Sequence, residues 1–335
     1  MQVQVNWARE RAESVLVKAG LNDDQAALVS DALIEADLRG RATHGLIRLN
    51  SIVGRMKRMA RRPVRIETNR GAAVLVDGGN ELGYLVSDFC GRVAIERCRE
   101  HGIALVAAHD SSHAGMLGYF AERIARADLM GLCFTNCLPK TAPAGATQAV
   151  FGTNPLAIAI PTSASGSGPA SDPILLDFAT SAATIGDMLL AARDRRLLPE
   201  GVAVDADGTP TTDPTLAQKG ALLAFGGHKG SGLAFAIQLM CTAFTGATVF
   251  PGLGKDYGYI VMACDPFLFV SRTQFFEGVR ELIWGLKSAR PGQGVAEVRY
   301  PGERAFRARR RALAEGIVLD EPTARLLASA AASDR

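Results

Sequence analysis

Ile103-Ala104-Leu105-Val106-Ala107-Ala108 is a run of six apolar residues that indicates the fold class of this chain. Such a continuous apolar run is typical of a strand that is buried on both faces. The preceding segment, 84–101, has apolar residues at helical spacing, and a helix is also expected at 116–127. Strands and helices therefore alternate around this stretch, which predicts a mixed α/β or α+β core sheet.

Further strands are expected on both sides of this stretch, at 73–77, 130–135, 156–160, 174–177 and 259–263. The N-terminal region is expected to be helical instead. Asn22 and Gln25 have the spacing of a capping box at the start of its second helix, and a third helix is expected from Leu46 to about Met59. Other helices are expected at 187–193, 229–246, 275–287 and over most of 303–331. We therefore predict a helical domain built from both termini, residues 1–72 with 295–335, and a sheet-containing domain at 73–294.

Length and composition restrict the class of protein. The 335 residues are 48% hydrophobic and 21% charged, which is typical of a globular protein with a large core. The net charge of +3 does not indicate nucleic acid or an anionic membrane as a partner. We expect no signal peptide and no membrane span. The six cysteines form no CxxC pair, which predicts free thiols in the cytoplasm and no metal site at Cys133 and Cys137.

Several common catalytic motifs are missing. No G-x-G-x-x-G follows a strand, which argues against an ordinary Rossmann dinucleotide site. The chain has neither a G-x-x-x-x-G-K-[ST] phosphate loop nor a G-x-S-x-G nucleophile elbow. Its five histidines have no zinc-ligand spacing such as H-E-x-x-H.

The segment Ala42-Thr43-His44-Gly45-Leu46-Ile47-Arg48 carries groups suited to carboxylate chemistry. His44 can exchange a proton near pH 7, and Thr43 can orient its imidazole. Arg48 can hold a small carboxylate by two parallel hydrogen bonds. Alternatively, the segment belongs to a surface helix without catalytic function. A hydrolase with Thr43 as nucleophile, and a binding protein without activity, are further alternatives.

Other candidate groups follow expected strands or begin expected helices. The loop at 111–116 leads into a helix and exposes backbone N–H groups that favour an anion. Asp187 either orients His44 or caps a helix. Lys229 opens a long apolar helix, where a cation adds to an anion site. The arginines near the C-terminus form either a phosphate site or a solvated helix face; they are Arg304, Arg307, Arg309, Arg310 and Arg311.

Taken together and in this order, these segments resemble the malate/L-lactate dehydrogenase type 2 family, whose members are NAD(P)-dependent and do not have the Rossmann fold. The resemblance covers nearly the whole chain. It is carried by Ala42–Gly45, Ser112-His113, Phe151–Ile158, Asp177–Ser181, Thr211–Pro214, His228–Gly230 and Pro301–Arg304.

The resemblance implies a homodimer with a non-Rossmann mixed sheet for the cofactor and a helical domain from both termini. It implies that His44 donates the proton, that Thr43 is its hydroxyl partner and that Arg48 binds the substrate carboxylate. Most relatives have serine at the position of Thr43. The residues implied to line the cofactor are His113, Ala114, Gly115, Met116, Leu117, Thr153, Asp177, Phe178, Ala179, His228, Lys229, Pro301, Gly302, Glu303 and Arg304.

Two local features indicate a subgroup. Asp187 and His228 resemble the Δ1-piperideine-2-carboxylate/Δ1-pyrroline-2-carboxylate reductases, in which an aspartate completes a relay with the Ser/Thr-His pair. This favours a reductase of cyclic 2-imino acids, with Asp187 as a third catalytic residue. The alternative is a 2-hydroxy acid dehydrogenase of the malate, lactate, sulfolactate or ureidoglycolate type. The arginines after Glu303 could bind a 2′-phosphate and favour NADPH over NADH.

Overall fold

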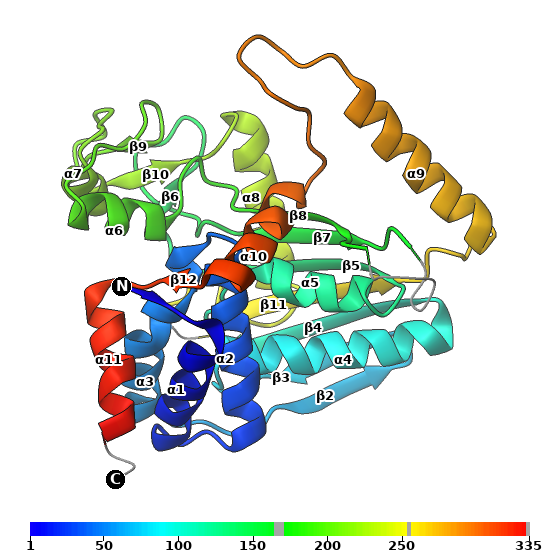
Figure 1. Ribbon diagram of the computed structural model, residues 1–335, viewed down its shortest axis with the longest axis horizontal. Coiled ribbons are helices and arrows are strands. Elements are labelled where there is room, and N and C mark those ends of the chain that lie inside the picture. Colours follow the sequence, from blue (N-terminus) through cyan, green and yellow to red (C-terminus); the bar gives the residue numbers. More distant parts are fainter. Residues whose placement is uncertain (164–170, 253–255, 333–335) are drawn as a thin grey trace.

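The computed structural model describes residues 1–163, 171–252 and 256–332, and its centre is a seven-stranded mixed sheet (Figure 1). The strand order is β2-β3-β4-β11-β5-β7-β8. Only β3 and β4 run parallel, and α4 connects them. The strands are β2 (Arg65–Arg70), β3 (Ala73–Asp77), β4 (Ile103–Ser111), β5 (Met130–Thr135), β7 (Leu156–Ile160), β8 (Ile174–Phe178) and β11 (Tyr257–Cys264).

The apolar stretch at 103–108 forms most of β4, which lies between β3 and β11, so the strand predicted there is confirmed. Its alternate residues serve two cores. Ala104 and Val106 pack with α4 (Gly83–His101) and α5 (Leu117–Ala125) on one face. Leu105 and Ala107 pack with α8 (His228–Cys241) on the other face. Helices on both faces explain why this strand has no polar side.

Helices from both chain ends pack together beside the sheet, as the sequence predicts (Figure 1). The terminal strands β1 (Gln2–Val3) and β12 (Ile317–Val318) pair antiparallel, and the Met1 amino group donates a 2.8 Å hydrogen bond to the Leu319 carbonyl. The capping box of Asn22 and Gln25 is present. The helices of this layer are α1 (Val5–Lys18), α2 (Asp23–Leu38), α3 (Leu49–Arg58), α10 (Glu303–Glu315) and α11 (Glu321–Ala332).

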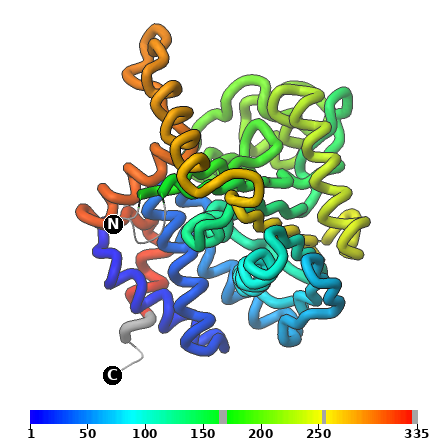
Figure 2. The backbone as a smooth tube through the Cα atoms, turned by 90° about the vertical axis from the view of Figure 1, so that its right-hand side faces the viewer, coloured from blue at the N-terminus to red at the C-terminus, as the bar shows by residue number. Residues whose placement is uncertain are grey.

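Two further parts extend from this body. A small three-stranded sheet packs with two helices around its own core; its elements are β6 (Thr141–Ala142), α6 (Ile185–Arg193), β9 (Ala203–Val204), α7 (Pro214–Lys219) and β10 (Ala221–Leu223). Helix α9 (Arg272–Ser288) and the segment after it project away from the body in both views (Figure 2). Phe276 is the buried residue of α9.

The structure corrects two local predictions. Strand β2 lies inside 1–72, the range that we expected to be helical; it is an edge strand with mostly exposed side chains, so no apolar alternation marks it. The third helix begins at Leu49 rather than at Leu46, because two 3₁₀ turns, Ala42–His44 and Leu46–Arg48, precede it. The Ser-, Gly- and Pro-rich stretch 163–172 predicts an exposed loop, and residues 164–170 of it lie outside the described residues. The division into two domains remains a prediction.

Within the described residues, no helix combines the length and the hydropathy needed to cross a membrane.

Candidate active site

The chain around His44 is shaped by a partly buried carboxylate that the sequence did not reveal. Asp37, near the end of α2, accepts a 2.8 Å hydrogen bond from the backbone N–H of Leu46. A Cβ atom on Gly45 would lie 2.0–2.4 Å from this carboxylate, so only glycine fits between the two 3₁₀ turns. This arrangement interrupts the helix and presents Thr43 and His44 on a short loop. The Thr43 hydroxyl lies 3.0 Å from Nδ1 of His44.

A second imidazole faces the first. The rings of His44 and His113 are stacked with their centroids 5.8 Å apart and an interplanar angle of 20°. Arg48 Nη2 lies 3.0 Å from Nε2 of His113, and the backbone N–H of Gly115 points at Nδ1 of the same ring at 3.1 Å. A neutral imidazole carries one proton and has one acceptor nitrogen. His113 therefore cannot accept from both donors, and this group has more donors than acceptors.

Both imidazoles are held neutral. Burial, together with the nearby charges of Arg48 and Arg41, lowers the pKa of His44 to about 4, whereas Asp187 acts in the opposite direction. Burial and Arg48 also lower the pKa of His113 well below its usual value. A bound anion beside Arg48 would offset part of this effect, because it would neutralise the guanidinium charge.

Asp187 closes a capping box at the start of α6. Its carboxylate accepts hydrogen bonds from the backbone N–H of Thr184 at 3.3 Å and from the Thr184 hydroxyl at 2.7 Å. The start of α6 nevertheless lies against the His44 loop, since a Cβ atom on Gly186 would be 2.5 Å from Cβ of Thr43. Asp187 therefore caps the helix and also acts on His44 through its charge.

Three of the segments expected to line the cofactor meet at the edge strand β8. Asp177, at the end of this strand, accepts a 2.9 Å hydrogen bond from the N–H of Gly118 in the first turn of α5. It thereby ties the loop of His113, Ala114, Met116 and Leu117 to the sheet. On the same strand, the N–H of Leu175 donates to the carbonyl of Pro301 at 3.0 Å. This bond places the turn Pro301–Arg304 beside β8.

Thr153, Phe178 and Ala179 form a second group, around the residues that follow β8. The carbonyl of Thr153 accepts from both the N–H and the hydroxyl of Thr180, at 2.8 and 3.0 Å. The Thr153 hydroxyl lies 3.3 Å from Sγ of Cys137. Phe178 contacts Phe225 edge to face at 5.6 Å, which connects this group to the loop before α8.

His228 and Lys229 are exposed in the first turn of α8, and the described contacts do not join them to the His44 group. Arg304 is exposed in the first turn of α10. Helix N-termini that carry cations suit the phosphates of a dinucleotide, and the small residues at 111–118 leave backbone close to the site. The residues present therefore fit an anionic dinucleotide cofactor.

The cluster of C-terminal arginines is largely neutralised by carboxylates. Arg309 pairs with Glu35 at 2.7 Å, Arg310 with Asp172, and Arg307 with Glu297 and Glu303. Within the described residues no ion pair is recorded for Arg304 or Arg311, and both are exposed. The five arginines thus do not form one continuous phosphate site.

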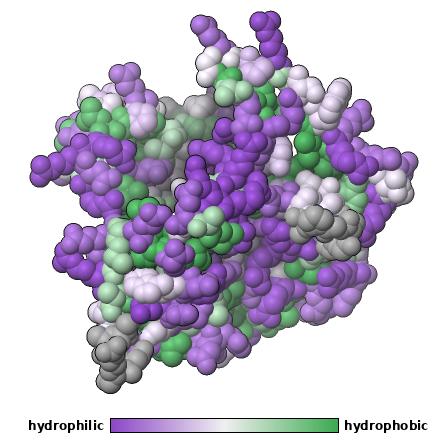
Figure 3. Space-filling view, in the orientation of Figure 1, coloured by the Kyte–Doolittle hydropathy of each residue, from purple (hydrophilic) through white to green (hydrophobic). Residues whose placement is uncertain are grey.

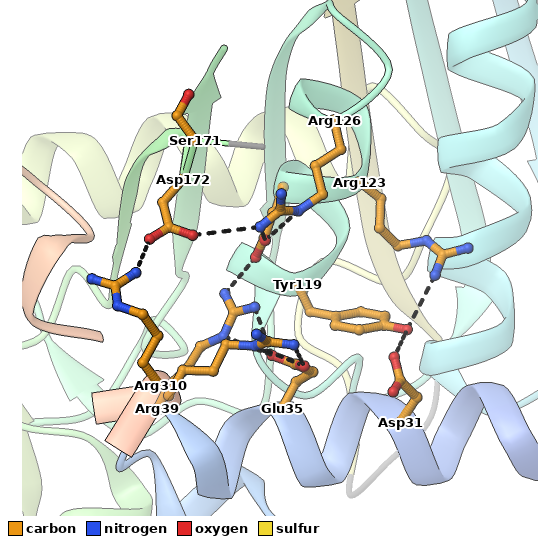
Figure 4. A pocket seen from close by; sticks show the side chains of 11 residues that line it. Asp31, Glu35, Arg39, Tyr119, Arg123, Arg126, Ser171, Asp172 and Arg310 are labelled. Atoms are coloured by element: carbon orange, nitrogen blue, oxygen red, sulfur yellow. Dashed lines mark hydrogen bonds and ion pairs between the residues drawn. The ribbon is translucent and has the colours of Figure 1, made fainter. Parts of the chain in front are cut away.

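A cavity of about 650 Å³ lies between α2, α5 and α10 (Figure 4). Arg309 and Arg310 of the C-terminal arginine cluster line it, and none of the other predicted site residues does. Figure 4 shows its arginine and carboxylate side chains pointing toward one another. Arg39 lies 2.8 Å from Glu35 and 2.5 Å from Glu122, and the Tyr119 hydroxyl donates to Asp31 at 2.8 Å. The charged side chains that line this cavity pair with one another. We therefore assign them to the packing of the helices and not to the His44 site.

Tyr84 is a second residue that sequence analysis missed. It is 2% exposed at the start of α4, and its ring meets His113 edge to face at 6.5 Å. No sequence pattern marks it, because it lies 36 positions beyond the end of the His44 segment, Arg48.

Known proteins resemble this chain over almost its full length. A family model described as malate/L-lactate dehydrogenase matches residues 3–328. L-Sulfolactate dehydrogenase of Methanothermobacter thermautotrophicus is 34% identical over 92% of this chain and 90% of its own length. Δ1-Pyrroline-2-carboxylate reductase of Pseudomonas fluorescens is 35% identical over 90% of each chain.

A solved structure agrees with these sequence relatives. A dehydrogenase from Sinorhizobium meliloti superposes with a TM-score of 0.90 at 33% identity, over 98% of both chains. The similarity thus includes the mixed sheet, the helical layer and the His44 segment. The chain is an enzyme that belongs to the malate/L-lactate dehydrogenase family of NAD(P)-dependent oxidoreductases.

Proposed function

We propose that this enzyme reduces a small 2-imino or 2-oxo carboxylate with NAD(P)H, and that its substrate is a cyclic imino acid, Δ1-piperideine-2-carboxylate or Δ1-pyrroline-2-carboxylate. The observation that carries this proposal is the position of Asp187, whose fixed negative charge acts on His44 from the start of α6. A carboxylate here favours a reacting group that is positively charged, as a protonated imine is. A neutral carbonyl would gain less from it.

Arg48, His44 and Thr43 would have separate roles in this reaction. Arg48 leaves His113 and holds the substrate carboxylate through two hydrogen bonds. The anion then raises the pKa of His44, which delivers a proton to the imine nitrogen, while Thr43 fixes the ring through Nδ1. When bound, the nicotinamide cofactor supplies the hydride. A positioned proton donor of this kind contributes about 10²–10⁴-fold to the rate.

Oxidation of a 2-hydroxy acid such as malate or sulfolactate is the second candidate. Arg41 supports it, because it places a second positive charge near His44 and could meet the second acid group of such a dianion. The neutral state of His44 also supports it, since removal of a hydroxyl proton needs a base. For the cofactor we propose NADPH, with exposed Arg304 as the partner of the 2′-phosphate.

Absorbance of the reduced nicotinamide tests this proposal directly. The protein is mixed with NADPH or NADH and, in turn, with Δ1-piperideine-2-carboxylate, Δ1-pyrroline-2-carboxylate, oxaloacetate and pyruvate. We expect fast oxidation of NADPH with the cyclic imines. Turnover of only the open 2-oxo acids would establish the second candidate, and turnover of none would contradict both.

Asp187→Asn tests the role of the charge separately from the cap, because asparagine can still accept from Thr184. We expect kcat/KM for the cyclic imine to fall about 3–10-fold, since loss of this partly screened charge lowers the pKa of His44. The alkaline limb of the pH–rate profile, where His44 loses the proton that it donates, should move to lower pH. Asp194→Asn, at the other end of α6, is the control. An unchanged profile in Asp187→Asn would reduce Asp187 to a helix cap.

A further inference from the structure

The hydroxyl of Tyr84 is a buried polar atom without a hydrogen-bond partner in the described structure. The residue stands at the second position of α4, and its side chain is almost fully enclosed. Buried hydroxyl groups in folded proteins nearly always have a hydrogen-bond partner. An unpaired one at a functional site indicates that a bound group forms the missing hydrogen bond.

The surroundings of this phenol belong to the candidate site. Its ring lies edge-on to His113, and the positive charge of Arg48 acts on it. The loop after His113 closes over it. A Cβ atom on Gly115 would lie 2.5 Å from the ring and 3.0 Å from the hydroxyl oxygen, and Gly115 has a φ of +74°. Glycine is therefore needed where this loop passes over Tyr84.

Donors outnumber acceptors around this group. Arg48 offers only donors, the N–H of Gly115 is a second source, and the Tyr84 hydroxyl is a third. The imidazole of His113 provides one lone pair for all of them. An anion with several lone pairs would satisfy the set, and a carboxylate accepts up to four hydrogen bonds.

We propose that Tyr84 is a substrate-recognition residue, whose hydroxyl donates a hydrogen bond to the substrate carboxylate held by Arg48. This inference rests on the proposed function, which supplies the carboxylate. When Arg48 exchanges His113 for the carboxylate, the bond that fixes the loop at His113 is released. A small shift of Gly115 then brings the phenol and the anion together. Tyr84 therefore discriminates by binding and takes no part in proton transfer.

Tyr84→Phe removes the hydroxyl and keeps the ring beneath Gly115. The probe is pyrrole-2-carboxylate, a planar five-membered ring acid that cannot be reduced in this way, titrated calorimetrically into the NADPH-loaded protein. Loss of a hydrogen bond to a charged group should weaken its Kd about 10–100-fold. KM for the substrate should rise similarly, kcat should change less than about threefold, and the Kd for NADPH should stay the same.

The matched control is Tyr259→Phe. Tyr259 is also a fully buried phenol, but it lies in β11 beside Cys133, inside the sheet core. We expect it to leave both Kd values unchanged. If both variants weaken the probe equally, or if Tyr84→Phe binds it like the wild type, the proposal is wrong.

The two proposals fail in different ways. In one outcome the wild type binds the probe, Tyr84→Phe binds it more weakly, and neither protein turns over any substrate. The proposed reaction is then wrong, and the recognition role of Tyr84 stands. If the wild type turns over its substrate and Tyr84→Phe has the same KM and Kd, only the role of Tyr84 is wrong. A wild type that binds no carboxylate overturns both.

Discussion

The partly buried carboxyl of Asp37 shapes the catalytic loop and should affect the pH dependence of stability. Burial raises its pKa to about 7, well above the ordinary value of 3.8, against the hydrogen bond from Leu46 that lowers it. Between these two pH values the unfolded chain has lost the proton that the folded chain keeps. Folding stability therefore falls as the pH rises through this window.

Asp37→Asn should remove this loss, because the amide oxygen can still accept from Leu46 and does not ionise. In the wild type the free energy of unfolding falls between pH 4 and pH 7.5. In Asp37→Asn we expect this fall to be smaller by about 1–3 kcal/mol. Urea unfolding at several pH values measures it. Asp207→Asn, in an exposed turn, should follow the wild type. Parallel curves for Asp37→Asn and the wild type would show that Asp37 is ionised in the folded protein.

At the scale of elements, a buried ion-pair network joins three helices. Arg39 on α2 lies between Glu35 of the same helix and Glu122 on α5, and Arg309 on α10 also binds Glu35 (Figure 4). Arg39 also packs over the ring of Phe306, 5.1 Å from its centroid. The network attaches the helical layer to the sheet next to the His44 loop, which begins three residues after Arg39.

Arg39→Met should destabilise the protein by about 3–5 kcal/mol, because it leaves buried carboxylates with fewer partners. Chemical denaturation measures the change. Arg325→Met is the control, since Arg325 pairs with Glu321 in an exposed i,i+4 ion pair, and it should cost less than about 0.5 kcal/mol. A similar loss of stability in both variants would mean that the buried network contributes no more to stability than the exposed ion pair.

At the scale of the whole molecule, helix α9 is poorly covered by the rest of the chain, since Phe276 is its buried residue. It projects from the body, and apolar side chains show among the charged ones on this part of the surface (Figures 2 and 3). Trp284 is 72% exposed and Leu282 71%, while Phe269, just before the helix, is 94% exposed. Exposed apolar surface of this kind is typical of a site that binds another molecule. It supports the homodimer that the family resemblance implies.

Trp284→Glu should therefore convert a dimer into a monomer, because a buried charge at the interface opposes association. Light scattering after size-exclusion chromatography measures the mass. Leu197→Glu is the control, since Leu197 is equally exposed at 72% but follows α6 on the small three-stranded part. A Trp284→Glu protein that keeps the mass of two chains would exclude α9 as the dimer surface.

Features that depend on near neighbours in the chain could be predicted from the amino-acid sequence. The apolar run at 103–108, the capping box of Asn22 and Gln25, and the contact of Thr43 with His44 follow from spacing along the backbone. These local patterns, in their order, also determined the family. Strand β2 escaped prediction because an exposed edge strand needs no apolar face.

Contacts between residues that are distant in the chain are set by the three-dimensional fold. The stacking of His113 on His44, the close approach of Gly186 to Thr43, the carboxylate of Asp37 under Gly45 and the orphaned hydroxyl of Tyr84 join segments that are remote in the chain or separated by a turn. Such contacts are set by how helices pack on the sheet, and side-chain packing has no periodic trace in the sequence. The chemistry of the residues could be read from the chain, whereas their placement around one imidazole pair required the fold.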